Sequence, residues 1–350
     1  MTTTAQTAAF DTLATALRGP VIQPGDEGYD AARAVYNAMI DRRPAAIARC
    51  ADVADVITAD GQRRVASPAS EPDLFWALRG GGGNFGVVTS FEFRCHEVGT
   101  VVAGPVLYDI GDTTGLLRWY REILPSLPEE LNGWAAVFTI PPAPPFPEEL
   151  WLRKVCGIVW CYTGPAERAD EVLAPVRGFG SPLLDAIMPM PYPVLQGMFD
   201  ALYPPGLQWY WRADFFNEIP DQALAAHQEF GETLPTMLSG MHLYPIDGAV
   251  HRVSADSTAF AYRDAGWNGV IVGVDPDPAN AGKIKDWAVR YWEALHPTSA
   301  GGAYVNFMMD EGTDRVRASY GRNYDRLARV KAAYDPGNFF RINQNVTPRG

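Results

Sequence analysis

The sequence predicts an α+β protein in which an antiparallel sheet is covered by helices on one face. From residue 99 onward, β-branched and aromatic segments alternate with segments of helical periodicity. The 33 glycines and 29 prolines exceed average usage, which indicates many turns. The 10 Trp, 15 Tyr and 16 Phe residues require a large core, so these turns belong to a folded chain.

The elements before residue 99 are expected to be short. We expect Asp30 to cap a helix that carries Val35 and Ile40, and a short strand to follow at 45–47. Asp60-Gly61 lies between strand-like residues 56–58 and 64–66, which predicts a hairpin. A short helix at 74–78 and an alternating strand at 87–93 complete this part.

The elements after residue 99 have clearer periodicity. Apolar spacing of 3.6 residues is sharpest at 279–295 and predicts a long amphipathic helix there. Two Pro-rich segments, 141–147 and 181–206, are predicted as loops, and we expect the second to shape a substrate pocket. Strands are predicted at 101–107, 134–140, 155–162 and 270–274, and further helices at 116–124 and 165–178.

Charge and composition exclude several classes of function. The net charge of -12 argues against nucleic-acid and anionic membrane partners, and no apolar run is long enough to span a membrane. The chain begins without a secretory signal pattern, and its four cysteines include no CxxC pair. Cys156 and Cys161 should lie on opposite faces of one strand. The five histidines show no metal spacing, so we expect a cytoplasmic protein with reduced thiols and no metal.

Four successive glycines at 80–83 form the sharpest local feature. Gly81, Gly83 and Gly86 satisfy the pattern G-x-G-x-x-G, but a helix precedes them and a strand follows, the reverse of a dinucleotide-binding loop. Two interpretations remain open from the pattern alone. The run is either a flexible connector, or a backbone surface that a planar or phosphorylated ligand can approach closely.

The residues around these glycines carry a family resemblance. Residues 73–89, Asp-Leu-Phe-Trp-Ala-Leu-Arg-Gly-Gly-Gly-Gly-Asn-Phe-Gly-Val-Val-Thr, resemble a motif of the berberine-bridge-enzyme-like FAD-linked oxidases. Residues 18–50 resemble that family's opening and 323–345 its closing segment. The resemblance implies a remnant of a PCMH-type FAD-binding domain in 1–98, a substrate domain in 99–306, and a returning segment in 307–350.

The resemblance also implies site residues and a reaction. Tyr304, in the matching Tyr-Val-Asn-Phe segment, is the candidate base, and Arg263 is expected to form a structural ion pair. The implied reaction transfers a hydride from a hydroxylated or secondary-metabolite substrate to flavin, with O2 as the acceptor. The candidate cofactor-binding residues are Gly81, Gly82, Gly83, Asn84, Gly86, Val88, Asn343 and Asn345.

The chain departs from the family between Cys50 and Ile57, where a long stretch is absent. That stretch normally supplies a pyrophosphate loop and the residues for covalent flavin attachment, so FAD is expected to bind non-covalently. Losing about three charge-assisted hydrogen bonds would cost on the order of 5–9 kcal/mol of cofactor binding. A flavin-free remnant that binds ligands or other proteins is therefore the alternative function, and an incomplete gene sequence is a third explanation.

Overall fold

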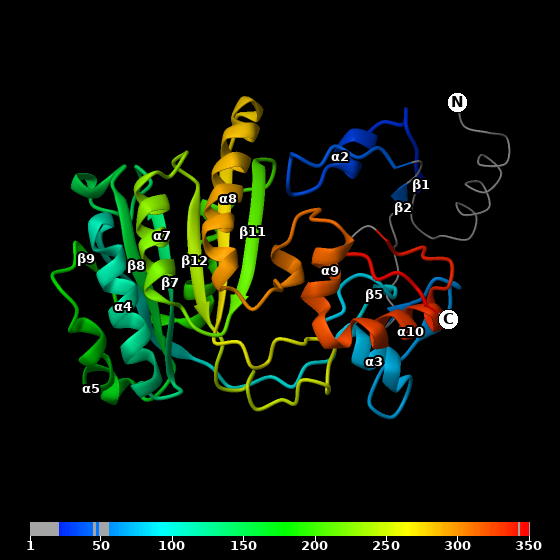
Figure 1. Ribbon diagram of the computed structural model, residues 1–350, viewed down its shortest axis with the longest axis horizontal. Helices are drawn as coiled ribbons and strands as arrows, with labels where there is room; N and C mark the ends of the chain where they lie inside the picture. The colour runs from blue at the N-terminus through cyan, green and yellow to red at the C-terminus, as the bar shows by residue number, and fades with distance from the viewer. Residues whose placement is uncertain (1–20, 45–46, 49–55, 342–343, 350) are drawn as a thin grey trace.

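The computed structural model describes residues 21–44, 47–48, 56–341 and 344–349. A large sheet with its helices forms one part, and a smaller part contains the N-terminal elements together with the C-terminal helices (Figure 1). The predicted shortening near 51–57 falls largely on 51–55, outside the described residues.

The large sheet has eight strands in the order β10-β6-β8-β7-β12-β13-β11, with β9 also paired to β6. All of its strand pairings among the described residues are antiparallel, as the sequence predicts. The four predicted strands correspond to β6, β7, β8 and β13, whereas β11 and β12 were not predicted. The strands are β6 (Thr100–Asp109), β7 (Leu131–Thr139), β8 (Lys154–Tyr162), β9 (Leu184–Asp185), β10 (Met188–Pro191), β11 (Gln208–Phe216), β12 (Gly240–Pro245) and β13 (Trp267–Asp275).

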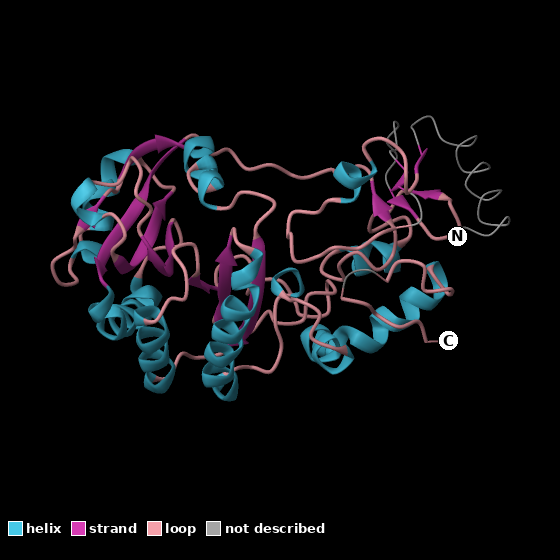
Figure 2. Ribbon diagram, turned by 90° about the horizontal axis from the view of Figure 1, so that it is seen from above, coloured by secondary structure: helices cyan, strands magenta, loops and turns pink. Residues whose placement is uncertain are grey.

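Helices α4 (Thr113–Ile123), α7 (Asp221–Glu232) and α8 (Ala281–Leu295) cover one face of this sheet (Figure 2). In α8 the predicted 3.6-residue spacing is confirmed, because its apolar residues are the buried ones. The short α5 (Ala169–Leu173) lies between two turns within the predicted helix 165–178. The buried residues of α8 are Ile284, Trp287, Ala288, Tyr291 and Leu295.

A second core lies on the opposite face of β11 and β13. Val270, Val272 and Val274 of β13 pack there against α3 (Pro72–Leu78), α9 (Thr313–Tyr320) and α10 (Tyr324–Tyr334). Ile271, between them in sequence, belongs to the first core instead. All nine residues of β13 are buried, so this strand is shared by both cores.

The smaller part contains two small sheets. β1 (Val21–Ile22) pairs with β2 (Ile47–Ala48), and β3 (Val56–Ile57) pairs with both β4 (Arg63–Arg64) and β5 (Val87–Val88). The predicted Asp60-Gly61 hairpin is thus confirmed. The strand predicted at 87–93 ends at Val88, and Phe91 and Phe93 beyond it are 67% and 73% exposed.

The structure corrects two expectations about local structure and confirms a third. The helix assigned to Asp30 is only α2 (Tyr29–Arg33); Gly28 precedes it, and Val35 and Ile40 lie outside it, exposed. The segment 181–206 is not a plain loop, because it contains β9, β10 and α6 (Tyr192–Gly197). Cys156 and Cys161 are free and pack in different clusters, on opposite faces as predicted. No helix among the described residues is long and apolar enough to cross a membrane.

Candidate functional site

A cavity of about 500 Å³ lies where the two parts of the molecule meet. Its wall combines the end of α3, strands β11 to β13, and the loops that follow β12 and precede α9. Contrary to our expectation, no residue of 181–206 lines it. The lining residues are Arg79, Gly80, Phe215, Tyr244, Ile246, Val250, Thr258, Phe260, Arg263, Asn268 and Tyr304.

Tyr304 and Gly80, the first residue of the glycine run, both line this cavity, although more than 200 positions separate them in the sequence. The Tyr304 hydroxyl accepts a hydrogen bond from Nδ2 of Asn306 at 2.8 Å. Its ring packs edge-on against Phe260 and Phe307, with centroids 6.4 and 5.2 Å away. These contacts fix the phenol at the edge of the cavity.

The glycine run forms a bend, and its glycines play different structural roles. Gly80 has φ +119°, and a Cβ there would lie 2.5 Å from the main-chain nitrogen of Phe260. A Cβ at Gly81 would clash with the Ala77 carbonyl, so both glycines permit close packing. Gly82 and Gly83 are exposed, and among the described residues their main-chain amides have no hydrogen-bond acceptor. These two present the open backbone of the bend.

Asn84 holds the bend to the C-terminal segment. Its buried Nδ2 donates to the carbonyl oxygens of Gly81 (2.9 Å) and Gln344 (3.0 Å), and its Oδ1 accepts from the Val346 amide at 2.9 Å. The Tyr320 hydroxyl completes the cluster at 3.2 Å from Nδ2. The Asn84 side chain is therefore occupied by protein partners.

The other predicted cofactor residues lie beside the bend or outside the described chain. Gly86 packs against the Ile57 carbonyl of β3, and Val88 belongs to β5. Asn345 lies between the two residues that bond Asn84, and its buried Oδ1 has no hydrogen-bond partner. Asn343 lies outside the described residues. An unpaired buried acceptor in the segment that binds Asn84 is the kind of group a ligand can satisfy.

A chain of hydrogen bonds behind the cavity was not found from the sequence. Nδ1 of His242 lies 3.0 Å from the Tyr244 hydroxyl, and Nε2 lies 3.0 Å from the Tyr203 hydroxyl. Burial lowers the pKa of His242 to about 4, so the ring is neutral at pH 7 and donates through one nitrogen only. The sequence signal that could have predicted this contact is the spacing of His242 and Tyr244, because residues two apart in a strand lie on the same face.

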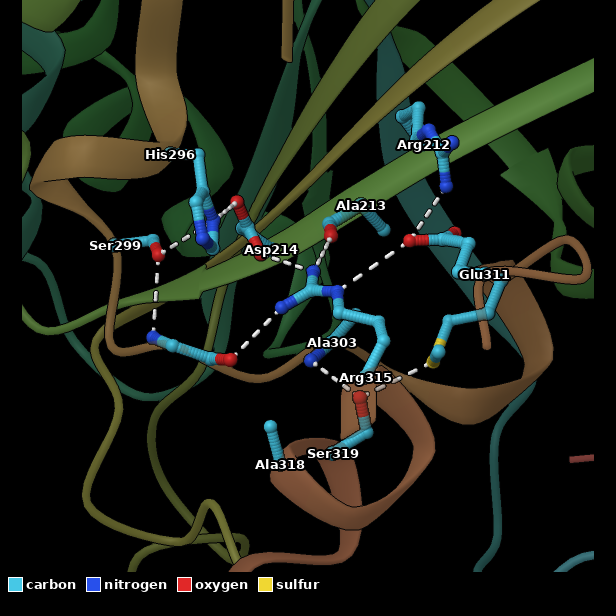
Figure 3. Close-up of polar contacts among 12 residues, drawn as sticks. Arg212, Ala213, Asp214, His296, Ser299, Ala303, Glu311, Arg315, Ala318 and Ser319 are labelled. Carbon is cyan, nitrogen blue, oxygen red and sulfur yellow. Dashed lines mark hydrogen bonds and ion pairs between the residues drawn. The ribbon is translucent and has the colours of Figure 1, made fainter. Parts of the chain in front are cut away.

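A buried ionic cluster fixes the chain just before Tyr304 (Figure 3). Arg315 of α9 donates to the carbonyl oxygens of Gly301 (2.8 Å) and Ala213 (2.7 Å) and pairs with Asp214 of β11. His296 lies 2.9 Å from Asp214. Burial raises the pKa of Asp214, against the opposing effect of Arg315 and His296. The cluster thus joins α9 to the large sheet and positions residues 301–303.

A second buried pair belongs to the same cluster. Nη1 of Arg212 lies 2.6 Å from Oε2 of Glu311, and Arg315 contacts that carboxylate at 3.4 Å. Below it, the Ala303 amide donates to Ser319 Oγ at 3.1 Å. Residues on both sides of Tyr304 are therefore held by side chains.

Arg263 does not form the structural ion pair that we expected from the sequence. Its guanidinium donates to Thr258 Oγ1 at 2.8 Å and to the Val250 carbonyl at 3.4 Å. Within the described chain it pairs with no carboxylate. Both partners are neutral, so the positive charge of Arg263 is not compensated at this cavity.

Comparison with known proteins supports the family resemblance. Residues 303–347 match the family model "Berberine and berberine like". An FAD-linked oxidoreductase of Dictyostelium discoideum is 28% identical over 296 residues, which cover 82% of this chain and 61% of the relative. The FAD-linked oxidoreductase YgaK of Bacillus subtilis is 29% identical over 290 residues, 81% of this chain and 60% of its own. This chain therefore spans about three fifths of the length of these relatives.

Solved structures share the fold. The 6-hydroxy-D-nicotine oxidase of Arthrobacter nicotinovorans superimposes with a TM-score of 0.79 at 18% identity, over 95% of this chain and 98% of that one. Xylooligosaccharide oxidase of Myceliophthora thermophila, solved with xylobiose, gives 0.68 at 22% identity over 85% and 66%. The matched segment and the two sequence relatives show that the chain is similar to the berberine-bridge-enzyme-like FAD-linked oxidoreductases, and the solved structures show that it shares their fold.

Proposed function

We propose that the chain is an FAD-linked oxidase that removes a hydride and a proton from a small hydroxylated substrate, with O2 as the final acceptor. The observation that carries the proposal is the cavity that Tyr304 shares with the glycine bend. A candidate base and the start of a glycine bend at one cavity are protein groups that such a reaction can use.

The residues present fit the ring end of a flavin. The bend exposes the backbone of Gly82 and Gly83, and Asn345, in the segment that binds Asn84, has a buried Oδ1 without a hydrogen-bond partner. The described lining contains neither His nor Cys, which supports non-covalent binding. Free thiols at Cys95, Cys156 and Cys161 support a reducing compartment such as the cytoplasm.

When bound, flavin supplies a hydride acceptor and returns two electrons to O2, which gives H2O2. The protein has to take the second hydrogen of the substrate as a proton. In this proposal Tyr304, as the phenolate, accepts the hydroxyl proton while the C–H bond breaks and a carbonyl forms. The substrate thereby loses two electrons and two protons, which equal those gained by O2.

Tyr304 needs help to act as a base, because an unperturbed phenol has a pKa near 10. Arg79 and Arg263 lie in the same cavity wall, and Asn306 donates a hydrogen bond to the phenolic oxygen at 2.8 Å.

The decisive experiment is a visible spectrum of the purified chain, followed by titration with FAD. Retained or added flavin should give a protein-bound spectrum, and candidate alcohols should bleach it without O2 and yield H2O2 with O2. Absence of bound flavin at millimolar FAD would contradict the proposal.

The alternative function is a flavin-free module that binds a ligand or another protein. The exposed Phe91 and Phe93, which continue from β5 without a covering layer, favour it. In the same experiment, saturable binding of a small aromatic ligand to a chain that takes up no FAD would support this alternative.

A further inference from the structure

Two arginines converge on the cavity from opposite parts of the molecule. Arg79 ends α3 on the side of the glycine bend, and Arg263 lies in the loop between β12 and β13. Burial, and next the positive charge of Arg79, lower the pKa of Arg263, so the two cations act on each other. No Asp or Glu lines the cavity.

The contacts of both guanidinium groups are neutral. Arg79 donates to the carbonyl oxygens of Ser257 (3.0 Å) and Phe75 (3.3 Å) and lies 4.1 Å above the Phe75 ring. Arg263 donates to Thr258 and Val250, lies 5.1 Å from the Phe260 ring centroid, and has a buried Nε without an acceptor. Within the described residues, neither arginine forms an ion pair.

Other arginines near the cavity do form ion pairs, so the lack of a carboxylate partner is particular to Arg79 and Arg263. Arg326 pairs with Asp73 at 2.8 Å and Arg322 with Asp264 at 3.2 Å, one residue away from Arg263. The chain has 41 acidic and 29 basic residues, so carboxylates are in excess. Arg79 is exposed and Arg263 is partly buried with an unpaired Nε, so an anion in the cavity would gain charge-assisted contacts without having to displace a carboxylate.

The rest of the wall indicates which kind of anion. Phe215, Ile246 and Phe260 are apolar, and Tyr304 and the unpaired Oδ1 of Asn268 add a few polar points. A planar carboxylate on an aromatic ring matches this combination, because guanidinium groups bind carboxylates in a fork and the ring can lie on the apolar wall.

We propose that this cavity is a carboxylate subsite, so that the substrate is an aromatic acid held by Arg79 and Arg263 with its reacting hydroxyl toward Tyr304. This inference rests on the proposed function for the reaction, but anion binding itself does not require flavin. The competing source of negative charge is a phosphate of the cofactor, and the experiment separates the two.

The test is calorimetric titration of the full chain with benzoate and with neutral benzamide at pH 7.5, without added FAD. Benzoate should bind at least about 10-fold tighter than benzamide, as expected for a charge-assisted contact. Arg263→Gln and Arg79→Gln should each reduce this preference to about 3-fold or less, and Arg263→Lys should keep more of it than Arg263→Gln. Arg118→Gln, whose exposed side chain pairs with Asp221 on the distant helix layer, should leave it unchanged.

Three outcomes would overturn the inference. Benzoate that binds no tighter than benzamide removes the subsite. A preference that survives both glutamine variants, with circular dichroism showing that they are folded, places the anion elsewhere. Pyrophosphate binding that depends on Arg263, without benzoate binding, assigns the charges to the cofactor. A benzoate preference in a chain that takes up no FAD would keep the subsite while rejecting the proposed oxidase.

Discussion

Lys331 donates a hydrogen bond to the carbonyl oxygen of Asn84 at 2.6 Å, across 247 positions of sequence. Its side chain is fully buried and also contacts Asp335 at 2.5 Å. Burial lowers the pKa of Lys331. For Asp335, burial opposes ionisation, but the hydrogen bonds from Lys331, Phe339 and Phe340 outweigh it and lower the pKa. This pair therefore anchors the C-terminal segment beneath the glycine bend.

Replacing Lys331 by Met should destabilise the protein by about 3–5 kcal/mol, because Asp335 is left buried without its counter-charge. Urea unfolding followed by fluorescence measures the loss, and the added change Asp335→Asn should restore part of it. Arg317→Gln is the control, since this exposed side chain pairs with Asp325 at the surface and should cost under about 1 kcal/mol. Equal losses in Lys331→Met and the control would contradict the anchoring role.

The buried His227 and the partly buried His242 predict an acid-sensitive fold. Burial lowers the pKa values of His227 and His242 from 6.5 to about 4. Between pH 6.5 and 4 the unfolded chain binds protons that the folded chain refuses, so stability is complete above pH 6.5 and falls below it. Each histidine should lower the free energy of unfolding by about 3 kcal/mol when the pH falls to 4.

Unfolding measured at several pH values checks this expectation. His242→Gln should reduce the slope of stability against pH in that window, whereas His251→Gln, at an exposed position, should not. A slope unchanged in His242→Gln would show that this histidine does not contribute.

Tyr304→Phe should slow flavin reduction by about 10²–10⁴-fold while the flavin content stays the same, because it removes the base without opening the wall. Rapid-mixing absorbance under anaerobic conditions measures the step. Tyr192→Phe in α6, whose hydroxyl contacts only Gln196 of the same helix, is the matched control. Equal reduction rates in wild type and Tyr304→Phe would exclude Tyr304 as the base.

Gly80→Ala should be more destabilising than Gly25→Ala, although both glycines have positive φ. The values are +119° for Gly80 and +103° for Gly25, but a Cβ at Gly25 meets nothing within 4 Å. The strain alone costs about 1–2 kcal/mol, and Gly80→Ala adds a clash with the backbone of Phe260. Thermal unfolding compares the two, and equal shifts would mean that the bend and the 258–263 loop do not pack as closely as described.

The sequence predicted features that depend on local pattern. The periodicity of α8 and the Asp60-Gly61 turn are local, and both are confirmed. The strand at 87–93 was overextended, because β5 has a partner strand only at Val87 and Val88. The strand β11 was not predicted because its sequence, Gln-Trp-Tyr-Trp-Arg-Ala-Asp-Phe-Phe, mixes charges into a largely buried strand. The strand β12 was not predicted although its residues alternate in burial.

The candidate site likewise combines motifs that the sequence predicts with features that only the folded chain shows. Gly80 and Tyr304 belong to separate motifs, and only the folded chain shows that they line one cavity. Arg263 looked like an ion-pair partner because arginines usually find carboxylates, and the absence of one at this wall is a three-dimensional fact. His242 and Asp214 owe their pKa shifts to burial, which no spacing of residues reveals.

The central position of β13 constrains how this molecule can be divided. The two faces of this strand belong to two different cores. A fragment that contains only the large sheet and the three helices α4, α7 and α8 would therefore expose Val270, Val272 and Val274. Such a fragment should aggregate, and denaturation of the intact chain should proceed as a single cooperative event. Evolution or engineering that exchanges the part containing the large sheet must therefore keep this valine row together with the helices that cover it.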